Sequence, residues 1–503
     1  MDHLAEIIHT FSKEDKKKFR IFLNRYRKKD SRKDLDLFIL LAEGNEKSGK
    51  EILGQLYAGD NNTEAYHATR KRLLKQLVDF TSLKTKGNAD MNSHILSLIT
   101  ISEYLFAKNR EEAGWHFIVQ AEKLAQKSAH YELLNAIFSI QIERSQSEFA
   151  PDLKEIMRKK RSCQELAIRE DNANTANQLI RYELNSSLAT GKEIDIGVVI
   201  RKVLKEYNLT NAVIQNPRLM YNLVAITRTA ILAKKDFYSF EPYIIQRYQA
   251  IEKKNIFNQY NHFYKVNLLY MICHVLYRNK KFSQALEYLR ILHGNMLDYR
   301  KSHYYLLYPK YALLLSATYN YSNKNDKAIS ILEELLLNRE IKLDKAQVLN
   351  INLNLALYYF QKEDYRRPSR LFLKMDTREK WILKNMGREW VLKKSLMECI
   401  NHYELGNNDL VENKIRWIEK NFDDYFQRPA YKRALTFLSL LKKLTIDPGI
   451  AHTREFRMLV EGSFKFIDVM QEDLQAIAFF AWLKSKILKK KFYPVLLEIV
   501  SVK

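Results

Sequence analysis

Residues 44–51 have the composition of a phosphate-binding loop. The run GNEKSGKE follows an apolar stretch and carries Gly44, Gly49 and Lys50, the glycines and lysine with which a nucleotide-binding loop cradles phosphates. Such a loop also needs a serine or threonine after the lysine to hold Mg²⁺, whereas Glu51 would bring a carboxylate against the phosphates. No series of alternating strands and helices follows. We therefore expect a solvated loop between helices and no bound nucleotide.

Metal-binding and catalytic residue types are scattered along the chain. Its 12 histidines and 3 cysteines include no HExxH motif and no grouping of His, Cys and Asp at metal-ligand spacing. Cys163, Cys273 and Cys399 lie too far apart for a dense disulfide framework, which fits a reducing compartment. We expect no enzymatic activity, no metal and no cofactor.

A basic cluster near the N-terminus is the best clue to a partner. Between Lys13 and Lys33, eleven cations face three acids, while charge elsewhere is more diluted. Such cations bind phosphates with salt-dependent affinity, and a basic helix after short helices is typical of a helix-turn-helix reader. The alternative is a solvated basic face. The candidate contacts with nucleic acid or an acidic partner are Lys13, Lys16, Lys17, Arg20, Arg27, Arg70, Lys71, Arg72 and Lys75.

The overall charge is compatible with an anionic partner but does not identify which kind. Lysine and arginine total 83 against 59 acidic residues, which gives a net charge of +24. A charge of this size suits nucleic acid, an anionic membrane surface or an acidic protein. The alternative is an AT-rich genome, whose codons supply lysine without any function.

Tyrosine and phenylalanine are abundant, at 30 and 25 residues. Tyr304, Tyr308 and Tyr311 lie near a repeated helix described below and are candidates for a peptide groove. Tyrosine buries a large area at low entropic cost and keeps a polar tip, which suits peptide recognition. The alternative is that these rings fill the core.

The elements that position these residues are expected to be helices. The chain has only 13 glycines and 8 prolines among 503 residues, fewer than sheets with tight hairpins need. In residues 1–85 we expect a small basic helical domain, with Ser12 as the N-cap of one helix and later helices over 35–42, 52–57 and 63–83. The polar run 84–93 is the predicted linker.

From residue 94 to residue 503, apolar stripes of helical period alternate with short polar turns. Three copies of one helix pair stand out. The first copy has Leu269, Ile272, Cys273 and Leu276 in its first helix, RNKK as the turn, and Ala285, Leu289 and Leu292 in its second helix. The second copy has Ala312, Leu315, Ser316 and Tyr319, the turn NKND, and Ala328, Leu332 and Leu335. The third copy has Leu355, Ala356 and Tyr359 in its first helix, followed by Tyr365, Phe372 and Met375. Three weaker copies follow. They are placed at Tyr104, Ala113 and Phe117, at Leu223, Ile231, Phe237, Phe240 and Ile244, and at Met397, Ile400, Leu410 and Trp417.

These helix pairs resemble the tetratricopeptide-repeat family, in which small residues at fixed places let two antiparallel helices approach closely. The resemblance implies an α-solenoid whose concave surface holds a peptide, a helix or a partner protein. Pro368 departs from the family because it stands where the third copy should have a small residue. The second-helix anchors are 40 to 45 residues apart, longer than the family's period of about 34. Residues 476–488, followed by three lysines, are expected to form a capping helix.

The sequence therefore predicts an all-α protein that acts as a non-enzymatic adaptor or scaffold with a protein or peptide partner. The competing hypothesis is a nucleic-acid-binding regulator, in which residues 1–85 contact DNA or RNA and the solenoid senses or dimerises. The apolar run Ala476 to Leu483 is far too short for a membrane span, and the N-terminus lacks the basic start and apolar core of a signal peptide. We expect a cytoplasmic protein.

Overall fold

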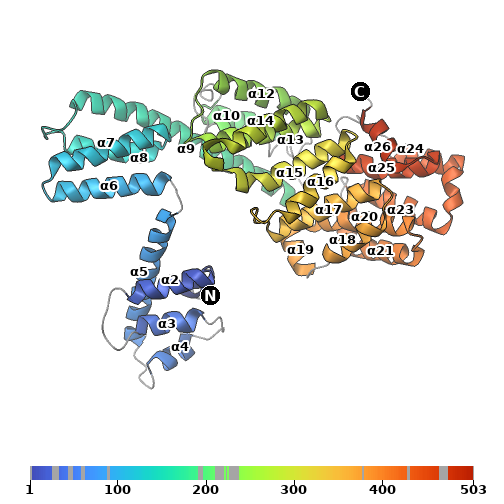
Figure 1. Ribbon diagram of the computed structural model, residues 1–503, viewed down its shortest axis with the longest axis horizontal. Coiled ribbons are helices and arrows are strands. Elements are labelled where there is room, and N and C mark those ends of the chain that lie inside the picture. The colour runs from blue at the N-terminus through green and yellow to red at the C-terminus, as the bar shows by residue number, and fades with distance from the viewer. Residues whose placement is uncertain are drawn as a thin grey trace. The chain divides into compact units, whose positions relative to one another are not determined.

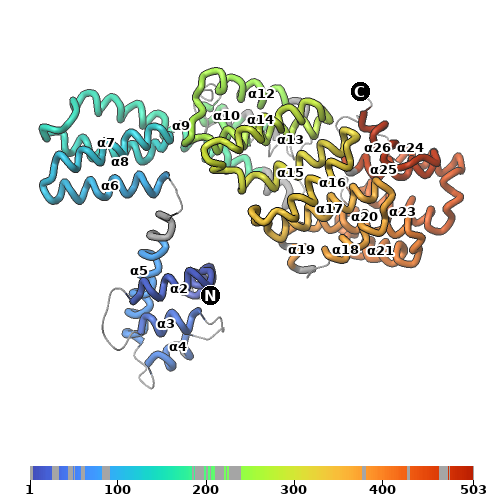
Figure 2. Tube along the Cα trace, in the orientation of Figure 1, coloured from blue at the N-terminus to red at the C-terminus, as the bar shows by residue number. Residues whose placement is uncertain are grey.

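The computed structural model describes residues 3–24, 33–42, 49–57, 63–87, 91–190, 196–209, 220–222, 224–225, 237–375, 379–427, 431–463 and 474–501 (Figure 2). Every regular element within these ranges is a helix, so the predicted all-α class is confirmed. None of the described helices is both long enough and apolar enough to cross a bilayer.

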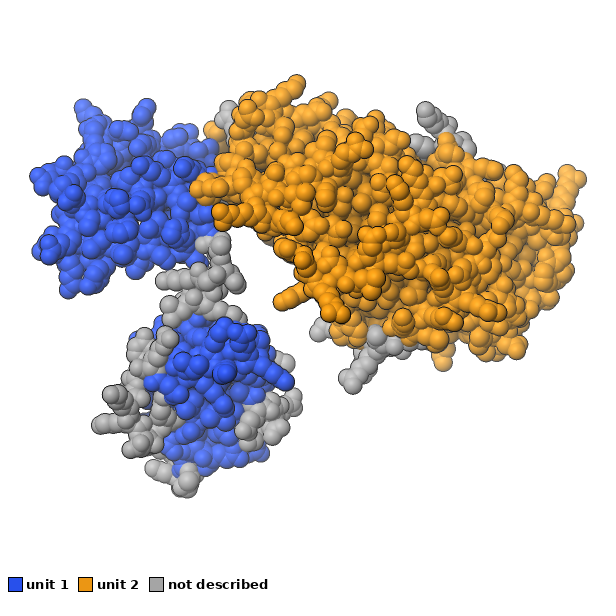
Figure 3. All heavy atoms as spheres, viewed as in Figure 1, with its two compact units in different colours: residues 1–167 blue, residues 168–503 orange. Residues whose placement is uncertain are grey.

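The chain folds into two compact units, residues 1–167 and 168–503 (Figure 3). Two clusters of buried apolar side chains lie in the first unit, one among its first five helices and one among the helices that follow. The predicted linker, 84–93, falls between these clusters, although residues 88–90 lie outside the described part of the chain. The helices are α1 (His3–His9), α2 (Lys13–Asn24), α3 (Lys33–Ala42), α4 (Gly49–Leu56), α5 (Thr63–Gly87), α6 (Met91–Ala107), α7 (Glu111–Lys127), α8 (Tyr131–Glu143) and α9 (Leu153–Thr190), which continues into the second unit.

The local signals in the N-terminal helices are confirmed. Ser12 caps α2, because its Oγ accepts a hydrogen bond from the Asp15 N–H while the Asp15 carboxylate accepts the Ser12 N–H, both at 3.1 Å. The apolar stripe of α2 points inward, where the Phe19 ring lies 5.0 Å from Phe38 and 5.1 Å from Phe80 of α5. Four basic side chains of α2 are exposed on its other faces: Lys13, Lys17, Lys18 and Arg20.

The second unit consists of helices packed mainly against their neighbours in sequence (Figure 1). They are α10 (Ile196–Glu206), α12 (Phe237–Lys253), α13 (His262–Arg278), α14 (Phe282–Lys301), α15 (Tyr304–Tyr321), α16 (Asn325–Leu337), α17 (Lys345–Gln361), α18 (Arg366–Met375), α19 (Glu379–Met386), α20 (Arg388–Glu404), α21 (Asn408–Asn421), α22 (Asp423–Phe426), α23 (Lys432–Ile446), the 3₁₀ helix η3 (Pro448–His452), α24 (Arg454–Ser463), α25 (Leu474–Leu488) and α26 (Phe492–Ser501). In addition, α13 contacts α15, α15 contacts α17 and α17 contacts α20. Successive helix pairs thus pack through their first helices and also through the contacts of α14 with α15, α16 with α17 and α18 with α20.

A short left-handed turn joins the two helices of each pair. One turn residue has a positive φ: Asn109, Lys280, Asn323, Glu363 and Gly406 in the pairs α6–α7, α13–α14, α15–α16, α17–α18 and α20–α21. The next residue donates its N–H to a carbonyl five residues back, as Lys281 does to Leu276 at 2.9 Å and Asn407 to His402 at 2.9 Å. This hydrogen bond closes the end of the first helix and reverses the chain.

Counted from the left-handed residue, these five pairs bury the same positions. The position seven residues before the left-handed residue holds Ser102, Cys273, Ser316, Ala356 and Cys399, and the position five residues after it holds Gly114, Ala285, Ala328, Pro368 and Val411. The position nine residues after it holds Ile118, Leu289, Leu332, Phe372 and Ile415. The position twelve residues after it holds Ala121, Leu292, Leu335, Met375 and Ile418. The first of these positions is small in every pair, which lets the two helices approach closely. Two further pairs, α7–α8 and α25–α26, share the turn at Ala129 and Lys489 but have Glu122 and Trp482 at that position.

This alignment corrects two of the three weaker copies, while the copy at Leu223 and Ile231 lies partly outside the described residues. Tyr104 is 62% exposed and Leu410 is 49% exposed, so neither is a core anchor. The buried positions lie one or two residues away, at Ser102 and Val411. Pro368, by contrast, does occupy the buried position predicted for a small residue. It is the third residue of α18, where its missing N–H has no partner within the helix to lose.

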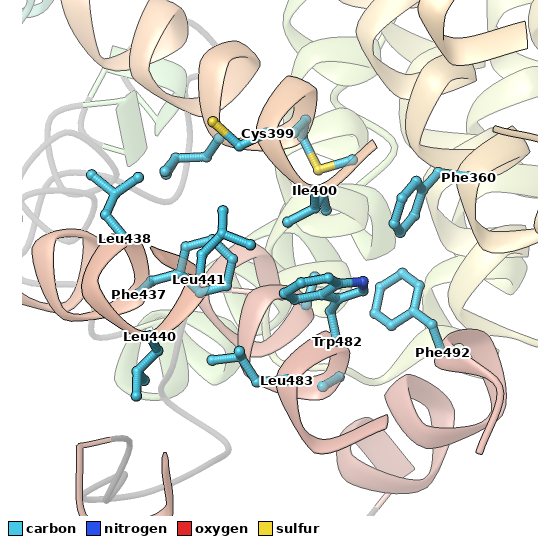
Figure 4. Close-up of a cluster of buried hydrophobic side chains, with 14 of the residues drawn as sticks. Phe360, Cys399, Ile400, Phe437, Leu438, Leu440, Leu441, Trp482, Leu483 and Phe492 are labelled. Carbon is cyan, nitrogen blue, oxygen red and sulfur yellow. The ribbon is translucent and has the colours of Figure 1, made fainter. Parts of the chain in front are cut away.

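The predicted helix over 476–488 is present as α25, and Trp482 of α25 and Phe492 of α26 lie in one buried cluster with Phe360 of α17 and Ile400 of α20 (Figure 4). Trp482 is fully buried and donates its Nε1–H to the Glu404 carboxylate at 2.6 Å. The Phe492 ring lies 5.6 Å from Phe360, and the Tyr493 hydroxyl donates to the Asn320 carbonyl. These contacts join α25 and α26 to α15, α17 and α20 in one core.

Candidate binding groove in the first unit

The predicted basic contacts fall into exposed and structural groups. Lys16 is half-buried and donates its Nζ to the Ala42 carbonyl at 3.1 Å, which fastens α2 to α3. Arg70 is half-buried, lies 5.5 Å from the Tyr66 ring centre and donates to the Tyr66 hydroxyl at 3.2 Å. Six others are exposed and form no ion pair within the described residues: Lys13, Lys17, Arg20, Lys71, Arg72 and Lys75. Arg27 and residues 43–48 of the loop-like motif lie outside the described ranges.

The predicted tyrosine groove is a packed ladder of rings. Tyr304 and Tyr308 stack with centroids 4.8 Å apart, and Tyr308 lies 5.8 Å from Tyr311. His293 of α14 stacks on Tyr311 at 5.4 Å. Tyr311 is buried, and burial raises the pKa of Tyr304 to about 12. These contacts favour the interpretation that the three rings fill the space between α14 and α15.

Sequence reasoning did not anticipate a groove between α8 and α9, within the first unit. It has a volume of about 430 Å³, a size typical of ligand sites. One wall is the stripe Tyr131, Leu134 and Phe138 of α8, at the i, i+3 and i+7 spacing of one helix face. The opposite wall is formed by α9, and Gln126 at the end of α7 completes the lining. The α9 residues are Arg158, Lys159, Ser162, Cys163 and Leu166.

Long polar side chains fix α9 beside the α7–α8 pair. Lys159 reaches the Glu122 carboxylate of α7 at 3.2 Å, and Lys160 donates to the Ser139 hydroxyl of α8 at 2.9 Å. Cys163 Sγ lies 3.2 Å from the Tyr131 carbonyl. Ile156 and Cys163 of α9 are also buried in one apolar cluster with Leu134 and Phe138 of α8.

Glu122 is the hub of this arrangement. It is buried and also accepts hydrogen bonds from Gln126 at 3.0 Å and from Gln141 at 2.8 Å. Burial lowers the pKa of Lys159, but the hydrogen bonds and charges of Glu122 and Glu155 outweigh burial and raise that pKa above its ordinary value. Lys159 is therefore charged at neutral pH, and its charge is matched by acids.

Arg158 is the unmatched charge on the groove wall. It is exposed and forms no ion pair or hydrogen bond with its side chain among the described residues. It belongs to the run LKEIMRKKR, residues 153–161, which holds five cations and one acid. This run was the sequence signal for the site, and the expectation that charge is diluted outside the N-terminal cluster overlooked it.

The groove is suited to binding rather than to covalent chemistry. Burial raises the pKa of the Cys163 thiol to about 11, so the thiol stays protonated and is a poor nucleophile at neutral pH. No group of three or more metal-ligating side chains is found in the part of the chain that the structure describes. The sequence matches no protein-family model, and no curated protein is significantly similar to it.

Proposed function

We propose that this protein is a non-enzymatic scaffold that holds protein or peptide partners on tetratricopeptide-like helix pairs. The observation that carries the proposal is the recurrence of one buried pattern in five pairs, from Ser102 to Ile418. The four pairs from α13–α14 to α20–α21 each contact the next, so this array extends by adding units. The spacing between turn residues 280, 323, 363 and 406 exceeds the family's period of about 34. The three unpaired cysteines, all buried, support a cytoplasmic setting.

A capture experiment tests the scaffold proposal. The purified chain, treated with nuclease, is used as bait at moderate salt, and each protein recovered is then purified and titrated against it by calorimetry. We expect at least one direct partner with a dissociation constant of about 10⁻⁶ M or below, because interfaces of standard size range from micromolar to picomolar affinity. If no recovered protein binds directly once purified, the scaffold proposal is wrong.

A second candidate function is nucleic-acid binding by the N-terminal helices. It is favoured by the six exposed cations of α2 and α5 that form no ion pair among the described residues. Retention on random DNA or RNA should then weaken steeply with salt, and reversing Lys71, Arg72 and Lys75 to Glu should flatten the logarithmic salt dependence by about 3 units. Retention that is independent of salt, or unchanged in the triple variant, excludes this function for α5.

A further inference from the structure

We infer that one exposed face of α5 binds double-stranded DNA by entering its major groove. The inference rests on the second candidate function, nucleic-acid binding by the N-terminal helices, and names the helix and the kind of nucleic acid. It is independent of the scaffold proposal. The face consists of Ala68, Lys71, Arg72 and Lys75 and is called the α5 face below.

The packing of α5 leaves this face open to solvent. Tyr66, Leu73, Leu77 and Phe80 are buried in the N-terminal apolar cluster together with residues of α2 and α3. Because a helix turns by about 100° per residue, the α5 face lies on the opposite side from these four residues. All of its side chains are exposed. The side of α5 that the core does not use is therefore available to a partner.

The charge on the α5 face is of one sign. Residues 65–78 contain no acid, and Glu64 and Asp79 bound this stretch. The three cations of the face form no ion pair within the described residues, whereas Lys18 of α2 is paired with Glu14 at 2.7 Å. A cation without an acidic partner is free to contact a phosphate, and each such contact releases a counterion and favours binding. The face therefore fits a polyanion.

The dimensions of α5 fit the major groove of B-form DNA. A helix with its side chains is about 10–12 Å across, and this groove is about 12 Å wide. The face rises about 10 Å from Ala68 to Lys75, at 1.5 Å per residue. Ala68 is its smallest residue, so the helix backbone can approach the base edges while the cations contact phosphates. The major groove of double-stranded RNA is too deep and narrow for such a helix.

The side chains around the face argue against two other partners. Single-stranded nucleic acid is held by bases that stack on exposed aromatic rings, but no phenylalanine or tyrosine is exposed among the described residues up to 87. The exposed large apolar residues there are aliphatic: Ile21, Leu74 and Val78. The centre of a protein interface is depleted of charge, whereas the centre of this face holds three cations. A DNA duplex is therefore the favoured partner.

Four labelled probes test the inference on the full-length chain by fluorescence anisotropy. They are a DNA duplex of mixed sequence, one of its single strands, an RNA duplex of the same sequence, and the DNA duplex with glucosyl groups on its cytosines. We expect the plain DNA duplex to bind at least about tenfold more tightly than the single strand or the RNA duplex. The glucosyl groups fill the major groove, so they should weaken duplex binding by about tenfold.

Charge reversal locates the contact on the chain. A variant with all three cations of the α5 face changed to glutamate should bind the duplex about a hundredfold more weakly at about 0.1 M salt, because each lost phosphate contact costs nearly tenfold there. The matched control makes the same change in net charge at three exposed cations of the α6–α7 pair: Lys108, Lys123 and Lys127. Charges more than about 10 Å apart are largely screened at this salt, so the control should lose at most about threefold. Because all six side chains are exposed, circular dichroism should show both variants folded.

The outcomes separate the inference from the candidate function on which it rests. Equal binding of the single strand or the RNA duplex, or unweakened binding of the glucosylated duplex, would reject the major groove and keep nucleic-acid binding. Equal losses in the two charge-reversal variants would show a diffuse attraction and would overturn the α5 face as the site. If no probe binds with a salt-dependent affinity, the second candidate function fails together with the inference, and the scaffold proposal is unaffected.

Discussion

Gly114 offers a sharp test of the packing that defines the helix pairs. It lies in the first turn of α7, and a Cβ placed on it would stand 2.5 Å from two atoms of the Phe106 ring. Phe106 is itself buried and packs edge-on against Trp115, so its ring cannot move aside freely. Overpacking of this kind costs about 1–3 kcal/mol, whereas glycine to alanine in a helix gains about 0.5–1 kcal/mol. Gly114→Ala should therefore lose about 1 kcal/mol of local stability.

The same substitution elsewhere should have the opposite sign. Gly294 lies inside α14 with no atom within 4 Å of a built Cβ, so Gly294→Ala should gain about 0.5–1 kcal/mol. Hydrogen exchange measured on peptides from α6–α7 and α14 reports both changes, as exchange about fivefold faster in Gly114→Ala and about two- to fivefold slower in Gly294→Ala. In a Phe106→Ala background the cost of Gly114→Ala should disappear. If Gly114→Ala slows exchange in α7, the close approach of the two helices is refuted.

Three further changes probe the second unit. Burial lowers the pKa of His262 below its usual value of 6.5, so on acidification the unfolded chain binds this proton before the folded chain does. The contribution of His262 to the free energy of unfolding should therefore be full above about pH 6.5 and decline below it. Urea unfolding between about pH 5 and 7.5 should show a shallower decline for the His262→Gln variant. Arg388 donates two hydrogen bonds to Asp424 at 2.7 Å, so Arg388→Lys should lose about 1 kcal/mol in thermal unfolding, and an unchanged midpoint would count against the paired geometry. Gly406→Ala should cost about 1 kcal/mol because its φ is +74°, and Lys489→Gly, at φ +53°, should gain a similar amount, both measured as shifts in urea midpoint.

The helix pairs were readable from the sequence wherever large apolar residues mark them. Large buried residues such as Leu289 and Leu332 belong to apolar stripes of helical period, and the low glycine and proline content excludes most alternatives to a helical fold. The register of the weaker pairs was not readable, because their decisive residues are small or polar. Ser102 and Gly114 look like surface or loop residues in a sequence, and only packing between α6 and α7 buries them, where the Ser102 hydroxyl donates to the Gly114 carbonyl at 2.9 Å.

The sequence could not decide whether the three tyrosines Tyr304, Tyr308 and Tyr311 form a binding surface or fill the core. A tyrosine is equally suited to a binding surface and to a core, and its sequence position does not distinguish the two. Tyr304 and Tyr308 stack on each other and on their neighbours because the kink at the end of α14, where Tyr299 and Arg300 have positive φ, brings α15 back against it. That return of the chain is a property of the tertiary structure.

The groove itself arises where the repeated pattern fails. In five pairs a small residue seven positions before the left-handed turn lets the helices close, but in α7–α8 that position is Glu122, and the twelfth position after the turn is Gln141. Gln141 donates a hydrogen bond to the Glu122 carboxylate at 2.8 Å, and Lys159 donates to the same carboxylate at 3.2 Å. The α8–α9 connection, residues 144–152, is described in full and has no residue of positive φ, so no left-handed turn brings α9 back along α8. A polar hub and a long connection therefore hold α9 beside α8 at the groove, where Leu134 and Phe138 of α8 are buried together with Cys163 of α9.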